Sequence, residues 1–394
     1  MRRWPTKPLG ELVDFVGGGT PRRNRPDYWG GDIPWASVKD LRSQSLETTL
    51  ETITAEGLAD SSSNLIPEGT VIIASRVGLG KVAINRKPVA INQDLKALIP
   101  SGDLLPQFLL LFLLLNAEVF ERAGVGATVK GLTIADYQKL KIPVPPLAEQ
   151  KRIVKLLDEA DELRTLRRQA DRRMVMLIPA IFHEMFGNPA DSWESLPLGD
   201  LVQEFRYGTS NKSATDGKPT LRIPNVVGQA VNLDDLKFVP VSGSEFDRLR
   251  LQDGDLLFVR TNGNADFIGR SAVFDAKAIE AAGFEASEFI YASYLIRARL
   301  QADRAQPIFV QHFLRSPVGV RALRARSKTS AGQFNINTEG LGTIPVPVPP
   351  LALQKEFAQR VTEIRPMEAT QTAGRQGLET LFQSMLYRAF AAEL

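Results

Sequence analysis

The nine residues PVPPLAEQK (143–151) recur 204 positions later as PVPPLALQK (347–355), with eight of the nine identical. In both copies, a run of prolines leads into apolar residues at helical spacing. The offset of 204 continues without a gap for another 35 residues and aligns apolar pairs such as Phe186 and Phe390. The repeat therefore marks a junction between two kinds of architecture that the chain contains twice.

The repeat also extends upstream of this junction. PLGELV (8–13) returns as PLGDLV (197–202), and the glycine-led segments EGTVIIASR (68–76) and DGDLLFVRT (253–261) occupy similar places in the two halves. Self-similarity at about 200 residues indicates duplicated domains, because solenoid repeats are far shorter. The sequence predicts four regions, which are a first globular domain (1–145), a first helical arm (146–187), a second globular domain (188–348) and a second helical arm (349–394).

Composition narrows the classes of chemistry that the chain could perform. The 394 residues include no cysteine and only two histidines, His183 and His312, which lie in different halves. Thiolate chemistry and a zinc site are therefore not expected. The apolar run 104–115 is too short for a membrane span, so we expect it to form a buried helix. With no signal peptide at the N-terminus, the expected location is the cytoplasm.

Charge is informative in its distribution rather than in its total, which is +3. Residues 305–338 contain five basic residues and no acid, and Arg22, Arg23 and Arg25 lie close to Tyr28 and Trp29. Basic residues that alternate with aromatics are typical of nucleic-acid binding. The alternative is a solvated charged face, and two such clusters, one in each half, favour DNA only modestly.

Short β-branched or apolar runs predict mixed α/β structure in both globular regions. The predicted strands are 69–75, 81–85 and 95–100 in the first copy and 255–261, 270–274 and 289–300 in the second. Strands and helices do not alternate regularly, so a doubly wound parallel sheet is not expected.

The two arms each predict one long helix with a single apolar seam. In the first arm, Pro146 fits the first turn, Pro179 should kink the last turns, and Gly187 is a plausible stop. In the second arm, Pro366 predicts a bend or break near Arg365. One narrow seam needs a partner, so we expect the arms to pack on each other as an antiparallel coiled coil.

The sequence contains no recognisable catalytic motif. The chain has no NPPY-type tetrapeptide, and RVGLGKV (76–82) has the wrong spacing for a phosphate-binding loop. GGGT (17–20) is a weak candidate for a phosphate cradle, and a tight turn that leads to DNA-facing residues is the favoured interpretation. These observations predict that the chain is not an enzyme and holds no cofactor or metal.

Taken together, these segments resemble the specificity subunit of type I restriction-modification systems over essentially the whole chain. The resemblance rests on LGELVDFVGGGTPRRNRPDYWGGDIPW (9–35), VIIASRVGLGKVAINRKPVAINQDLKAL (71–98) and the two junctions that end in AEQKRIV (148–154) and ALQKEFAQRV (352–361). Leu353 departs from the repeat, since the first copy has Glu149 there, and Pro366 is a second departure. Both put in doubt the symmetry of the two arms.

The resemblance implies an α+β fold with a pseudo-two-fold internal repeat. Two mixed α/β target-recognition domains would each read one half of a bipartite site in double-stranded DNA. The two long helices between them would set the spacing and dock two methyltransferase subunits. Motor-nuclease subunits would join through the methyltransferase subunits, and all catalysis would reside in these partners.

Reading of base edges requires Arg, Lys, Asn or Gln on loops that reach the major groove, whereas phosphate contacts require only positive charge. The candidates for DNA contact in the first domain are Arg22, Arg23, Arg25, Tyr28, Arg76, Lys81 and Lys130. Those in the second domain are Arg206, Tyr207, Asn211, Lys212, Arg222, Arg260, Asn262, Asn264, Lys328, Gln333 and Asn335. For each residue, the alternative is a surface salt bridge. Trp29 and Trp35 are expected to be core residues rather than stacking platforms.

Two rival functions stay open at this point. One is an enzyme, such as a methyltransferase fused to a recognition domain. The other is a non-catalytic interaction scaffold, or a methyltransferase-associated recognition protein outside a restriction system. Binding of S-adenosylmethionine and the salt dependence of DNA binding would separate these functions.

Overall fold

A computed structural model describes residues 4–123, 132–226, 228, 230–264, 267–330 and 332–394. The chain divides into two compact units. The first unit comprises Met1–Gln169 and Ala373–Leu394, and the second comprises Ala170–Thr372. Each unit therefore contains one globular domain, part of helix α5 (Leu147–Phe186) and part of helix α14 (Leu351–Phe390).

The first unit is built on two mixed sheets. One sheet has the order β2-β10-β7-β8-β4 and the other has the order β5-β3-β9-β6, while β1 and β11 form a separate antiparallel pair. The strands of the larger sheet are Val13–Gly17, Leu95–Pro100, Val71–Ala74, Val82–Asn85 and Ser45–Leu46, in that order. Those of the smaller sheet are Glu51–Ile53, Trp29–Ala36, Val89–Ile91 and Leu65–Ile66, and the pair is Thr6–Pro8 with Lys141–Pro143.

The helices of the first unit are short, apart from its share of α5 and α14. They are α1 (Ala55–Ala59), α2 (Pro106–Leu115), α3 (Ala117–Ala123) and α4 (Ile134–Gln138). Helix α2 packs against β7, β8 and β10 and buries every residue from Phe108 to Leu113. The expectation of a buried helix in the run 104–115 is confirmed.

The second unit repeats this strand order with one edge strand fewer in each sheet. Its larger sheet runs β13-β20-β16-β18, its smaller sheet runs β15-β14-β19, and β12 pairs with β23. The larger sheet consists of Val202–Tyr207, Leu295–Leu300, Leu256–Val259 and Ser271–Val273. The smaller sheet consists of Lys237–Val239, Lys218–Leu221 and Ile290–Tyr291, and the pair is Ser195–Pro197 with Pro345–Pro347.

A further small sheet in the second unit has the order β17-β22-β21, with strands Thr261–Asn262, Gln333–Asn335 and Lys328–Ser330. The helices of this unit are α6 (Pro189–Ser192), α7 (Leu198–Leu201), α8 (Ile223–Val226), α9 (Gly243–Leu249), α10 (Ala276–Ala281), α11 (Pro307–Arg315), α12 (Pro317–Arg326) and α13 (Thr338–Gly342).

The predicted strand 289–300 is interrupted. Ala292 forms an isolated parallel bridge with Thr209, and residues 293–294 form a turn before β20, which belongs to a different sheet from β19. The expectation of one strand there was wrong, because a turn at Ser293 and Tyr294 carries the chain from the smaller sheet to the larger one.

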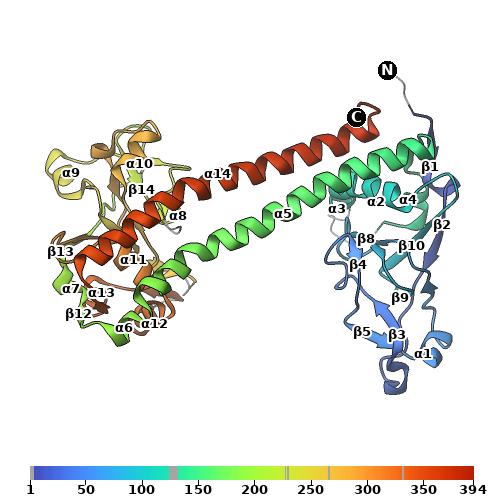
Figure 1. Ribbon diagram of the computed structural model, residues 1–394, viewed down its shortest axis with the longest axis horizontal. Coiled ribbons are helices and arrows are strands. Elements are labelled where there is room, and N and C mark those ends of the chain that lie inside the picture. The colour runs from blue at the N-terminus through green and yellow to red at the C-terminus, as the bar shows by residue number, and fades with distance from the viewer. Residues whose placement is uncertain (1–3, 124–131, 227, 229, 265–266, 331) are drawn as a thin grey trace. The chain divides into compact units, whose positions relative to one another are not determined.

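Within each unit, α5 and α14 lie side by side and antiparallel (Figure 1). In the first unit, Leu157 shares a buried cluster with Leu386. In the second unit, the rings of Phe182 and Phe186 contact Phe357 with centroids 5.3 and 5.6 Å apart. Residues late in α5 therefore contact residues early in α14, and residues early in α5 contact residues late in α14. The predicted antiparallel helix pair is confirmed.

A bend or a break was expected near Arg365; helix α14 continues through Pro366, so the break was wrong. Apolar residues before the proline, Val361 and Ile364, are buried in the second unit, and Phe382 after it is buried in the first. Packing on both sides of a proline sustains a helix that propensity alone would interrupt. Helix α5 likewise passes Pro179 and ends at Phe186, where Gly187 adopts a positive φ of 58° as a helix stop.

Candidate nucleic-acid interface

The small sheet β17-β22-β21 brings together candidate residues that lie about 70 positions apart in the sequence. Asn335 pairs across the strands with Thr261 on one side and with Lys328 on the other. Side chains of cross-strand partners share a face, and Gln333 shares it too because it lies two residues from Asn335. The Thr261 hydroxyl confirms this placement by donating to Gln333 Oε1 at 3.2 Å.

The opposite face of this sheet is directed toward the hydrophobic core of the second unit. Phe334, whose neighbours in the strand are Gln333 and Asn335, packs against the hydrophobic core of the second unit. The face with Lys328, Gln333 and Asn335 is therefore directed away from the core. Two carboxamides and one ammonium group on an exposed face are the donors and acceptors that read base edges.

Arg260 lies where β16 continues into β17. Its guanidinium carbon is 4.7 Å from the ring centroid of Tyr207, and its NH1 donates to the carbonyl of Ser293 at 3.4 Å. The hydroxyl of Tyr207 accepts from the backbone N–H of Thr338 at 3.3 Å. The stack therefore fixes two predicted residues beside the small sheet.

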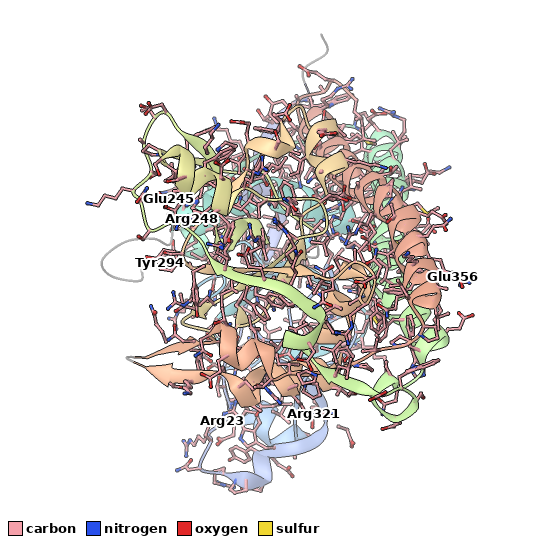
Figure 2. All side chains as sticks on the ribbon, turned by 90° about the vertical axis from the view of Figure 1, so that its left-hand side faces the viewer. Arg23, Glu245, Arg248, Tyr294, Arg321 and Glu356 are labelled. Atoms are coloured by element: carbon pink, nitrogen blue, oxygen red, sulfur yellow. The ribbon has the colours of Figure 1, made fainter. Side chains whose placement is uncertain are left out.

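The turn residue Tyr294 was missed by sequence reasoning. Its carbonyl accepts from the backbone N–H of Arg260 at 2.9 Å, and 58% of the residue is exposed. Tyr294 is labelled in Figure 2 near the edge of the second unit. An exposed aromatic beside an arginine suits contact with a nucleotide. Tyr294 was not among the predicted contacts because the sequence predicted an unbroken strand over 289–300 and no exposed turn there.

Other candidates of the second unit have internal partners. Arg206 pairs with Glu204, which also holds the buried Arg297 and whose pKa is lowered mainly by the hydrogen bond from Arg206. Asn211 donates to the carbonyl of Pro240 at 3.0 Å. Arg206 therefore stabilises the larger sheet, which leaves it less available for DNA.

The remaining candidates of the second unit lie on loops and turns, except Asn262, which ends β17. Lys212 is exposed, and so is Asn264, which follows the small sheet. Asn262 accepts the backbone N–H of Asn264 at 2.9 Å and so shapes that turn. Arg222 donates to Asp235, through the backbone carbonyl at 2.6 Å and the carboxylate at 2.8 Å.

In the first unit, Arg23 lies over Trp29 and against Glu51. Its guanidinium carbon is 3.7 Å from the ring centroid of Trp29, and its two terminal nitrogens donate to the two oxygens of Glu51 at 2.5 and 3.0 Å. This hydrogen bond is the main cause that raises the pKa of Arg23 and lowers that of Glu51. Trp35 is buried, which confirms the expectation for this residue, whereas Trp29 is only half-buried.

Arg25 and Tyr28 form a local support for the same loop. Arg25 pairs with Asp27 at 2.7 Å and lies 4.5 Å from the ring centroid of Tyr28. Tyr28 is buried, and its hydroxyl donates to Asp60 at 2.7 Å. Tyr28 is therefore placed to hold the loop and not to touch a ligand directly.

The turn between β7 and β8 carries two further candidates. Arg76 is well exposed and lies 3.9 Å from Asp94, while Lys81 and the more distant Arg22 are also exposed. These three cations are available to phosphate groups. Lys130 lies outside the described residues.

An open pocket of about 580 Å³ adjoins Arg23. It is lined by Thr20, Arg23, Trp35, Ser37, Lys39, Leu50, Glu51, Asn92 and Gln93. Sequence reasoning selected only Arg23 from this set, because the others come from four separate segments that only the fold brings together. A Cβ at Gly18 would lie 2.2 Å from the carbonyl oxygen of Ile91, so the glycines of GGGT permit a close backbone approach beside this pocket.

Across the described residues, no group of three or more His, Asp or Glu side chains is arranged to hold a metal ion. Within the same ranges, no helix is both long enough and apolar enough to cross a membrane.

Comparison with known proteins adds an independent line of evidence. Residues 1–171 match the family model described as the type I restriction modification DNA specificity domain. The chain is 27% identical to the type I restriction enzyme EcoKI specificity subunit of Escherichia coli K12, over 99% of this chain and 89% of that protein. It is 36% identical to the EcoR124I/EcoR124II specificity subunit of Escherichia coli over 40% of this chain and 41% of that one.

Solved structures show a similar fold. The S subunit of a type I restriction-modification system from M. genitalium gives a TM-score of 0.59 at 15% identity and covers 98% of this chain and 96% of that one. A chain from a structural study of complex assembly and conformational transition of the type I R-M system gives a TM-score of 0.62 at 17% identity. The match covers 100% of this chain and 99% of that one.

Proposed function

We propose that the chain is a specificity subunit of a type I restriction-modification system and therefore the sequence-specific DNA-recognition subunit of such a complex. Each unit would read one half of a bipartite site in double-stranded DNA. The observation that carries this proposal is the duplication itself. The same strand order recurs in both units, and the similarity to a curated specificity subunit spans 99% of the chain.

The polar surfaces described above supply the contacts that this function requires. In the second unit, these are the outward face of the small sheet and the stacked pair Arg260 and Tyr207. In the first unit, they are Arg23 with its pocket and the exposed cations Arg76 and Lys81. Carboxamides and arginines would read base edges, and the exposed lysines would contact phosphates.

We also propose that catalysis resides in partners. Two methyltransferase subunits would dock on the paired helices α5 and α14, and motor-nuclease subunits would join through them. Leu163, Leu166 and Met367 are more than half exposed on these helices, which is a high exposure for apolar side chains on a surface without a partner.

The test is to map methylated bases in DNA from cells that carry this gene together with genes for its partners. A bipartite motif with a non-specific spacer is the expected result. A continuous motif, or methylation by the isolated chain, would contradict the proposal, and the second result would favour the rival function of a fused methyltransferase.

A further inference from the structure

The pocket beside Arg23 lies at the point where β3 ends. Trp35, near the end of β3, is paired with Glu51 of β5 and with Ala90 of β9. The chain then supplies Ser37 and Lys39 after β3, and Asn92 and Gln93 after β9, to the same wall. Polar groups from four segments therefore converge on one concave site above a buried tryptophan.

Arg23 is held in one orientation by contacts of two kinds. The face of its guanidinium lies on Trp29, and the edge formed by its two terminal nitrogens faces the carboxylate of Glu51. A guanidinium has five N–H donors, so a second edge that includes Nε remains available for two further hydrogen bonds. Fixing an arginine in this way lowers the entropy that it loses when it binds a ligand.

The other groups of the pocket add mainly donors. Lys39 is a cation, and Gln93 has its carbonyl oxygen engaged by the hydroxyl of Thr20, which leaves its amide N–H groups for a ligand. Both carboxylate oxygens of Glu51 accept from Arg23. A donor-rich site selects a ligand with adjacent acceptors. Among the bases, guanine presents two acceptors, N7 and O6, in the major groove.

The second unit provides an internal comparison, because its backbone repeats this site. Gly208 approaches the carbonyl oxygen of Tyr291 as Gly18 approaches that of Ile91, each at 2.2 Å from the position of a Cβ. Ser37 in one unit and Arg222 in the other donate their backbone N–H at 2.8 Å to the side chain three residues ahead.

The side chains at equivalent positions nevertheless differ in chemistry. By strand register, Trp35 corresponds to Thr220, and their cross-strand partners are Glu51 and Lys237. At the position of Ser37, the second unit has Arg222, which donates to Asp235. A retained scaffold with altered polar groups is what two domains that read different sequences require.

We propose that this pocket is the place where the first unit reads one G·C base pair, with Arg23 as the base-contacting side chain and Glu51 and Trp29 as positioning residues. The inference rests on the proposed function and assigns one element of its specificity to one site. In the second unit, Arg222 stands at the position that Ser37 has in this pocket.

The experiment uses the complex of the full chain with its methyltransferase subunits. DNA libraries are randomised one base pair at a time across both half-sites, and methylation of each sequence is measured. Arg23→Ala and Arg23→Lys should reduce the preference for one G·C pair in one half-site by about tenfold to a hundredfold, with the other half-site unchanged. Glu51→Gln should relax the same pair, and Glu51→Asp should partly restore it.

The matched controls are Arg122→Ala and Glu118→Gln, which alter another arginine–carboxylate pair of the first unit, at exposed positions of helix α3. They should leave every base preference unchanged. Uniform weakening across all sequences by Arg23→Ala would show a phosphate contact and overturn the proposal, as would an unchanged preference. Arg23→Lys retains the charge, so the base preference can still be measured with this variant if the alanine variant fails to fold. If the unaltered complex shows no preference for a bipartite site, that result contradicts the proposed function and not the assignment of Arg23 to a base pair.

Discussion

At the scale of single residues, Gln150 ties the start of α5 to the globular part of the first unit. It is fully buried, accepts the backbone N–H of Leu105 at 2.9 Å, and donates to the carbonyls of Asp103 and Pro145 at 2.8 and 2.9 Å. Gln354 makes the corresponding bonds with Gln306 and Pro349 in the second unit. One glutamine in each copy of the repeat thus fixes the junction with which the sequence repeat begins.

Replacement of Gln150 by Met keeps the volume and removes these hydrogen bonds. The buried groups that lose their partner should lower the free energy of unfolding by about 2 to 4 kcal/mol. Denaturant unfolding measures the change, with Gln107→Met on the exposed surface of α2 as the control. Equal stability of the two variants would show that water replaces the glutamine without cost.

His312 makes the second unit sensitive to acid. Burial, with smaller effects of Arg365 and Arg315, lowers its pKa from 6.5 to about 3, and its Nε2 has no hydrogen-bond partner among the described residues. The folded state therefore keeps it neutral while the unfolded state takes up a proton. The stability that it contributes is present above pH 6.5 and is lost as the pH falls toward 3.

His312→Phe should retain the packing on Phe357, whose ring centroid lies 5.3 Å away. Between pH 6.5 and pH 5, this variant should lose about 1.5 kcal/mol less stability than the unaltered protein. Unfolding measured across that range, with His183→Gln at an exposed position as the control, tests the expectation. Parallel pH profiles would contradict it.

The residue types in the sequence predicted several side chains of the candidate interface but did not predict which of them face outward. Gln333 and Asn335 were predicted and lie on an outward face, whereas Tyr28 was predicted and is buried. An aromatic among arginines has the same sequence signal in both environments. The difference arises from Asp60, more than 30 residues away, which accepts the tyrosine hydroxyl.

At the scale of elements, the two long helices were predictable because a seam at helical spacing is a local signal. The sheet β17-β22-β21 was not, because its strands have only two or three residues and β17 pairs with β22 over about 70 positions. The same reason explains the division of 289–300 between two sheets. Short strands are determined by tertiary contacts more than by propensity.

Pro366 lies at an exposed position inside α14, where it supplies no N–H to the helix. Pro366→Ala should therefore raise the free energy of unfolding by about 1 to 3 kcal/mol, since no buried contact is removed. Thermal unfolding tests this, with Ala369→Pro in the next turn as a variant that should be strongly destabilised. A destabilising effect of the alanine would mean that the helix requires the proline.

At the scale of the whole molecule, the duplication could be predicted from the sequence. The two copies align at a constant offset of 204 residues over more than 40 positions, and duplication is the simplest explanation of such a match. Both long helices contribute to both units. We therefore expect the helix pair to govern the length of the spacer in the recognised DNA.

Insertion of seven residues after Ala170 and seven after Gly374 keeps both apolar seams in register. In the first unit, Gly374 of α14 already lies beside Arg167 of α5, so the two insertions fall at about the same level of the pair. Each adds about 10 Å of helix, which is on the order of three base pairs. Methylation mapping should show unchanged half-sites and a longer spacer. An active variant with the original spacer would show that other parts set the distance.

The most direct test of the account is an exchange of residues 1–142 for the corresponding region of a family member with a different site, followed by methylation mapping in cells that supply the partners. If each unit reads its own half-site, one half of the motif should change to that of the donor, and the other half and the spacer should stay as they were. A change in both halves, or in neither, would contradict independent reading by the two units.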